Sequence, residues 1–102
     1  MVQPRVILLV RLKSALSLEE VTKVLEERAP EFRALAGLQQ KYYLQDATTG
    51  EYAGLYLWES PEALAEYRDS ELRASIARAY QTEGEPRVEV YRVMKALRDD
   101  LG

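Results

Sequence analysis

Hydrophobic and polar positions follow two different periods along the chain, and the changes of period mark the expected elements. Residues 5–13, RVILLVRLK, form an apolar run too short for a globular helix, so we expect a strand buried on both faces. From Leu18 the apolar positions recur at a spacing of three and four, which predicts an amphipathic helix. Ser17 and Glu20 form a capping box at its start, and Pro30 is expected to end it.

A short turn and a hairpin are expected next. Residues 31–36 predict one more helical turn with Phe32 and Leu35 pointing inward, closed by Gly37. Two runs rich in aromatic and β-branched residues, 38–46 and 51–59, then flank the turn sequence ATTG, which predicts a β-hairpin. Four of the seven tyrosines and the only tryptophan lie in this hairpin, so it forms half of a core or one wall of a cavity.

The second half of the chain predicts a helix and a last strand. Ser60-Pro61-Glu62 is a strong helix start, and a local irregularity is expected at Asp69-Ser70. Residues 87–95 alternate as a strand, and residues 96–102 form a polar tail that frays or lies on a partner. The order predicts one α+β domain over residues 1–102, with the ferredoxin-like βαββαβ arrangement, a four-stranded antiparallel sheet and both helices on one face.

Alternation along the hairpin divides its side chains between the two faces of the sheet. A turn of two or four residues places odd-numbered residues of the first strand on the same face as even-numbered residues of the second. We name this face, which carries most of the aromatic rings, the ring face: Gln39, Lys41, Tyr43, Tyr52, Gly54, Tyr56 and Trp58. The other set is the aliphatic face: Leu38, Tyr42, Leu44, Ala53, Leu55 and Leu57. We expect the helices to cover the aliphatic face, although a three-residue turn would invert the assignment.

The ring face then needs a cover of its own, because so large an apolar patch is rarely left in water. On the first and last strands, neither of the two alternating sets of side chains is polar throughout. A homodimer that packs sheet on sheet satisfies both observations, and two-fold dimers are the commonest assembly.

Composition removes several function classes. The net charge is −3 and no basic stripe is present, so nucleic acid is a poor partner. The chain has neither cysteine nor histidine, which removes thiolate chemistry and the commonest general base and metal ligand. No phosphate-binding glycine loop and no metal-ligand spacing of carboxylates is found. Without a signal sequence or a long apolar run, we expect a cytoplasmic protein that does not enter the membrane.

The segments GLQQKYYLQD and TTGEYAGLYLWESPEALAEY resemble the family of proposed monooxygenases related to bacterial YdhR. That family belongs to the antibiotic-biosynthesis-monooxygenase type of dimeric α+β barrel. The resemblance is detailed over residues 36–67 and extends to the whole chain in architecture. It implies a ferredoxin-like protomer, two sheets closed into a barrel, and a cavity in each protomer.

The resemblance also implies a chemistry. Some relatives oxidise aromatic polyketides without metal or flavin, so no cofactor is expected. Trp58 matches a tryptophan that lines the cavity in better-understood relatives, whereas Gly54 stands where they have an asparagine. Haem-degrading relatives need a histidine, which this chain lacks.

Each candidate residue has a structural interpretation beside the functional one. Trp58 is either a core or interface anchor or a stacking wall for a planar ligand, and the tyrosines carry the same two alternatives. Lys41 either reaches the rim and pairs with a carboxylate or stabilises an enolate or phenolate in the cavity. Candidate catalytic residues are Lys41, Tyr56 and Trp58, and candidate substrate contacts add the other polar members of the ring face, Gln39, Tyr43 and Tyr52.

The expected function is a cofactor-independent monooxygenase that acts on a small planar aromatic or quinol-type substrate. The alternatives are a non-catalytic, small-molecule-binding or stress-related dimer, and a structural dimer whose aromatic rings fill the barrel. Cavity volume separates the last alternative from the other two.

Overall fold

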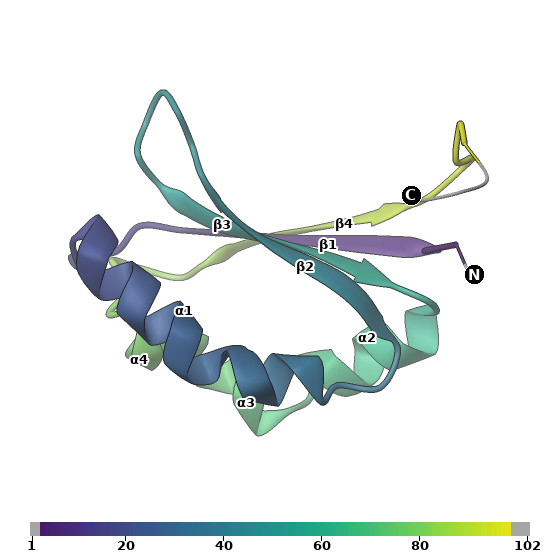
Figure 1. Cartoon of the computed structure of the whole chain (residues 1–102), viewed down its shortest axis with the longest axis horizontal. Coiled ribbons are helices and arrows are strands. Elements are labelled where there is room, and N and C mark those ends of the chain that lie inside the picture. The colour runs from purple at the N-terminus through teal and green to yellow at the C-terminus, as the bar shows by residue number, and fades with distance from the viewer. Residues whose placement is uncertain (1–2, 99–102) are drawn as a thin grey trace.

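The predicted order of elements is the observed one. The computed structural model describes residues 3–98. Its elements are β1 (Val6–Leu12), α1 (Leu18–Arg33), β2 (Leu38–Gln45), β3 (Tyr52–Trp58), α2 (Pro61–Arg68), α3 (Glu71–Ala74), α4 (Ile76–Ala79) and β4 (Arg87–Arg92). The strands form one antiparallel sheet in the order β2-β3-β1-β4. All the helices lie on one side of it (Figure 1), so the α+β ferredoxin-like fold is confirmed.

The helices begin where the capping residues predict. The Ser17 hydroxyl accepts a hydrogen bond from the Glu20 amide at 3.2 Å, and the Glu20 carboxylate accepts one from the Ser17 amide at 3.0 Å. Ser60 caps α2 by accepting from the Ala63 amide at 3.1 Å. The expected irregularity is present, because α2 ends at Arg68 and Ser70 caps the separate helix α3.

Pro30 does not end α1, and this prediction was wrong. The helix continues to Arg33, and the Ala34 amide donates to the Pro30 carbonyl at 3.2 Å. Proline removes one backbone donor from the helix. The extra turn buries Phe32, which is only 3% exposed, so apolar burial offsets that loss.

The hairpin has the predicted register over most of its length. Lys41 pairs with Tyr56 and Tyr43 with Gly54, as a four-residue turn requires. The turn closes with Gly50 at a φ of +78°. A register shift between Leu38 and Gln40 breaks the alternation, so Leu38 pairs with Trp58 and leaves the aliphatic face to which the pattern assigned it.

The ring face is covered by the chain's own helices, which corrects the predicted orientation of the sheet. Tyr56 and Trp58 are 2% and 0% exposed and belong to the hydrophobic core. Their rings are stacked at 6.3 Å, and Tyr67 of α2 lies 5.3 Å from Trp58. Alternation shows which side chains share a face, but not which face the helices cover. No second copy is needed to shield these rings.

The aliphatic face is the one that the helices leave uncovered. On β1 every second residue is buried, beginning at Val6, while Ile7 and Leu9 on the other side are partly exposed. The first strand is therefore buried on one face only within a single chain. Tyr42 of β2 and Tyr91 of β4 are each 50% exposed. β4 ends at Arg92, short of the predicted residue 95. Of the predicted tail, residues 99–102 lie outside the described part of the chain.

Candidate functional site

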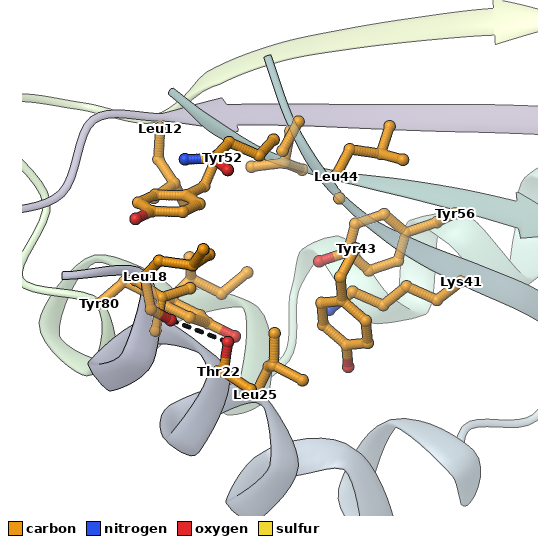
Figure 2. A pocket seen from close by; sticks show the side chains of 16 residues that line it. Leu12, Leu18, Thr22, Leu25, Lys41, Tyr43, Leu44, Tyr52, Tyr56 and Tyr80 are labelled. Atoms are coloured by element: carbon orange, nitrogen blue, oxygen red, sulfur yellow. Dashed lines mark hydrogen bonds between the residues drawn. The ribbon is translucent and has the colours of Figure 1, made fainter. Parts of the chain in front are cut away.

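A cavity of about 210 Å³ lies between the ring face of the hairpin and α1. One part of its wall is aliphatic and comes from β1, α1 and α4: Val10, Leu12, Leu18, Val21, Leu25 and Ile76. Figure 2 shows Lys41, Tyr43 and Tyr56 on one side of the space, with Tyr52 and Tyr80 on the other. The described residues that line it include hydroxyl, amide and amine groups but no carboxylate.

Lys41 lies against three aromatic rings at this cavity. Its Nζ atom is 3.5 Å from the ring centroid of Phe32 and 4.4 Å from those of Tyr43 and Tyr56. None of the ion pairs found among residues 3–98 involves Lys41, so it does not pair with a carboxylate at the rim. Burial, with a smaller contribution from the Arg28 guanidinium, lowers the pKa of Lys41 to about 7. Its amine therefore exchanges a proton near neutral pH.

Arg28 is held close to this cluster by α3. Its Nη2 atom donates to the Leu72 carbonyl at 3.2 Å and to the Ser75 hydroxyl at 3.0 Å. Its guanidinium carbon lies 5.8 Å from the centroid of Phe32, the ring that Lys41 also contacts. A fixed positive charge in this place disfavours the protonated form of Lys41.

Gly54 provides the space that the lysine side chain occupies. A Cβ atom at position 54 would lie 3.3 Å from Lys41 Cε and 3.0 Å from Tyr56 Cε1. Both contacts are closer than side chains normally allow. The resemblance implies an asparagine side chain at this position in relatives. In this chain the Lys41 side chain, from the neighbouring strand, occupies the space beside Gly54.

Three tyrosines at the cavity, Tyr43, Tyr56 and Tyr80, are neutral hydroxyl groups. Burial raises the pKa of Tyr43, places that of Tyr56 well above its ordinary value, and raises that of Tyr80 to about 12. The Tyr67 hydroxyl donates to the Tyr56 hydroxyl at 3.2 Å. These groups can donate hydrogen bonds to an anion, whereas Lys41 is the cavity group that titrates near neutral pH.

The structure brings together most, but not all, of the predicted site residues. Lys41, Tyr43, Tyr52 and Tyr56 line the cavity. Trp58 is not among the lining residues, and its side chain is fully buried in the core beside Tyr56. Gln39 lies at the register shift in β2 and is also outside the lining.

Sequence reasoning missed the residues that α1 and the segment after α4 add to the cavity. Thr22 lines it from the helix, and Tyr80 lines it from the opposite side. Both positions were visible in the sequence, Thr22 between the apolar positions of a helix and Tyr80 on an apolar face. Nothing in their spacing shows that these faces meet the hairpin.

A second, larger hollow lies between α2 and β4. It measures about 490 Å³, and its charged lining consists of Arg5, Arg68 and Arg92. None of the predicted site residues borders it. The residues that the structure describes contain no cluster of three or more acidic, histidine or cysteine side chains suited to a metal ion.

The comparisons with known proteins agree with this fold. Residues 7–98 match the family described as "Putative mono-oxygenase ydhR". The chain belongs to this family. Searching the curated proteins gives no match. Within the described residues, no helix has the length and apolar character needed to cross a membrane.

Solved structures of several bacterial proteins share the fold. One is described as a putative antibiotic biosynthesis monooxygenase from Caulobacter crescentus, with 20% identity, a TM-score of 0.73, and coverage of 92% of this chain and 93% of that one. SnoaB, a cofactor-independent oxygenase from Streptomyces nogalater, has 14% identity, a TM-score of 0.73, and coverage of 94% and 99%. A third, described like the first but from Deinococcus radiodurans, has 16% identity, a TM-score of 0.71, and coverage of 91% and 96%.

Proposed function

We propose that this family member is a cofactor-independent monooxygenase that acts on a small planar aromatic or quinol-type compound bound beside Lys41. The observation that carries the proposal is an amine with a pKa of about 7, set among three rings in an apolar cavity. An apolar cavity of about 150 Å³ accommodates benzene. The 210 Å³ found here therefore suits one substituted ring. The description of SnoaB as a cofactor-independent oxygenase supports the reaction class.

The first step is removal of the substrate's acidic proton. Neutral Lys41 accepts the proton from a phenol or enol and becomes an ammonium ion beside the new anion. A base whose pKa is close to the working pH is the most effective general base. The low-dielectric cavity strengthens the attraction between the ammonium and the anion, and the neutral tyrosine hydroxyls can donate hydrogen bonds to it.

The second step is reaction of the anion with dioxygen. The anion gives one electron to dioxygen, and the resulting radical pair joins to form a carbon–oxygen bond. The hydroperoxide then loses water and leaves a carbonyl group. In the net reaction, a CH₂ group and one O₂ give a ketone and one H₂O. For a phenol, a ring C–H, the hydroxyl group and one O₂ give a quinone and one H₂O. The substrate supplies all the electrons, so the protein's residues bind, deprotonate and exclude water.

Oxygen uptake tests this proposal. Wild-type protein is incubated with a panel of one-ring hydroquinones and phenols, and with a three-ring anthrone. We expect turnover of one-ring substrates, and a loss of about 10²-fold or more in Lys41→Met. Lys23→Met, which changes an exposed lysine on α1, is the matched control and should keep full activity. Equal rates in wild type and Lys41→Met would contradict the proposal.

A non-catalytic, small-molecule-binding protein is the second candidate. Gly54 favours it, because the asparagine that the resemblance places in catalytically active relatives is absent here. In that case the same phenols would bind, and would quench tyrosine and tryptophan fluorescence, with no oxygen uptake above the buffer rate.

We also propose that the working unit is a homodimer that packs sheet on sheet. What supports it is the uncovered aliphatic face, where Leu55 lies opposite Leu9 and Tyr42 on the neighbouring strands. Tyr42 is half exposed, and Leu9 and Leu55 are partly exposed in the single chain. This surface, rather than the ring face, is the one that a second copy would cover.

A further inference from the structure

The amine of Lys41 is placed for a second kind of chemistry, in which it acts as a nucleophile. We propose that Lys41 captures small carbonyl compounds in the cavity as imines, and that 1,3-dicarbonyl compounds are the class it retains best, as enaminones. This activity depends on the position of the lysine and not on oxygen chemistry. It therefore goes beyond the proposed oxygenase function and can be tested separately from it.

The first argument is that the amine has no counter-ion among residues 3–98. The ion pairs among the described residues join Arg11 and Arg87 to acidic partners, and Lys41 takes part in none of them. A lysine becomes nucleophilic when it is desolvated in an apolar pocket or placed near another cation. Lys41 meets both conditions, through its three neighbouring rings and through Arg28.

The second argument is a contrast within the chain. Lys13, Lys23 and Lys95 are exposed, whereas Lys41 is partly buried and lines the cavity. An exposed lysine is almost entirely protonated at neutral pH and has no lone pair with which to attack. Only one of these four amines is thus held in a site that favours its neutral form.

The third argument is the shape of the site. In Figure 2 the lysine's nitrogen end is directed toward the space bordered by Tyr43 and Tyr56. The aliphatic residues of β1 and α1 form the opposite wall and keep the space apolar. Removal of water from the first adduct is favoured in such surroundings. A five- to eight-carbon dicarbonyl compound is of the size that a cavity of about 210 Å³ can hold.

The reaction balances without an oxidant or reductant. The nitrogen lone pair forms a bond to the carbonyl carbon, and the carbonyl oxygen takes a proton from the amine to give a carbinolamine. The nitrogen lone pair then expels the hydroxyl group, which leaves as water after gaining a proton. Loss of the last N–H proton gives the neutral imine, so amine plus carbonyl give imine plus water. With a 1,3-dicarbonyl compound, a proton shift from the central carbon gives the conjugated enaminone.

The groups that surround the amine predict a single-step pH dependence. They are Arg28 from α1, Tyr43 from β2 and Tyr56 from β3. Tyr67 from α2 is hydrogen-bonded to Tyr56, and Tyr80 after α4 lines the other side of the cavity. Burial raises the pKa of all four tyrosines, so Arg28 is the one charged neighbour in this set at neutral pH. Adduct formation should therefore follow the ionisation of Lys41 alone.

The experiment uses 2,4-pentanedione under anaerobic conditions. We expect the near-ultraviolet absorbance of an enaminone, at one equivalent per chain, with a rate that rises through a midpoint near pH 7. In parallel, benzaldehyde is added with borohydride, and the reduced adduct is located by peptide mass spectrometry. In wild-type protein the adduct should map to Lys41 at least tenfold in excess of Lys13, Lys23 or Lys95. This comparison within one folded chain does not depend on the stability of any variant.

Two variants complete the design. Lys41→Arg replaces the amine with a guanidinium that stays protonated and should abolish the absorbance, whereas Lys23→Arg should leave it unchanged. Equal labelling of all lysines, or an unchanged signal in Lys41→Arg, would overturn the inference. Oxygen uptake is measured separately, in air-saturated samples with the one-ring hydroquinones and phenols, and distinguishes this inference from the proposed function. An adduct without substrate-dependent uptake supports carbonyl capture and refutes the oxygenase. Uptake without an adduct supports the oxygenase and refutes carbonyl capture.

Discussion

At the scale of the residue, the proposed function depends on the surroundings of Lys41. The sequence shows that Lys41 lies among aromatic residues on β2, and it raises the question of whether the lysine reaches a carboxylate. The sequence could not answer that question, because Phe32 and Arg28 come from α1 and approach the lysine only in the folded chain. A side chain's charge state depends on such non-local neighbours, which spacing along the chain does not reveal.

Burial of Lys41 predicts that stability rises with pH just above neutrality. Between about pH 7 and the ordinary lysine value of 10.5, the unfolded chain keeps a proton that the folded chain has released. The unfolded state therefore binds more protons, and the free energy of unfolding rises by at most about 1.4 kcal/mol per pH unit. Urea unfolding from about pH 6 to about pH 9, below tyrosine ionisation, should show this rise in wild type but not in Lys41→Met.

Gly54→Ala tests the space that the lysine occupies. The added Cβ would lie 3.3 Å from Lys41 Cε and 3.0 Å from Tyr56 Cε1, so we expect the lysine to move toward solvent. Crowding of this kind costs about 1–3 kcal/mol in a well-packed site. The midpoint of adduct formation should also shift to higher pH. In the Lys41→Met background the same change should cost less, which a double-mutant cycle measures. Additive effects would contradict direct contact.

At the scale of the element, local signals predicted the helices and the hairpin well. Ser17, Ser60 and Ser70 all cap helices, and the register of the hairpin follows from its four-residue turn. Pro30 was misread, because a helix tolerates the loss of one donor when the next turn buries an aromatic side chain. The cover of the sheet was also misread, since Phe32 and Tyr67 meet the hairpin rings from the helices before and after the hairpin.

Two neighbouring residues of β3 test which side of the strand faces the helices. Trp58→Ala removes a fully buried ring and should lower the free energy of unfolding by about 3–5 kcal/mol. Leu57→Ala, on the aliphatic face, should lower the free energy of unfolding of the single chain by only about 1 kcal/mol. Chemical denaturation at low protein concentration measures both. The reverse order would mean that the strand faces the other way.

At the scale of the whole molecule, the sheet has one face covered by helices and one left open. The open side carries aliphatic residues of β1, β2 and β3 around Leu55. The prediction that a partner covers the ring face was wrong, because the chain's own helices cover it, and the open aliphatic face is the one left for the proposed partner. The rings and the lysine that line the cavity lie on the side of the sheet opposite the proposed dimer surface, and Leu44 and Ala53 of the aliphatic face also border the cavity.

Sedimentation tests the proposed dimer. Wild-type protein should sediment as a dimer at micromolar concentration, and Leu55→Arg, which places a charge among aliphatic residues, should shift it to monomer. Ala34→Arg, at an exposed position just after α1, is the matched control and should remain dimeric. Wild-type protein that stays monomeric at every concentration would exclude sheet-on-sheet assembly.

The central claim is that the Lys41 amine lies at an apolar cavity without a carboxylate partner among the described residues. Its most direct test is an NMR titration of the side-chain nitrogen in protein labelled with ¹⁵N-lysine, with Lys41→Arg used for assignment. The account predicts a midpoint for Lys41 near pH 7, well below the ordinary lysine value of 10.5. A Lys41 signal that titrates near that ordinary value would contradict it.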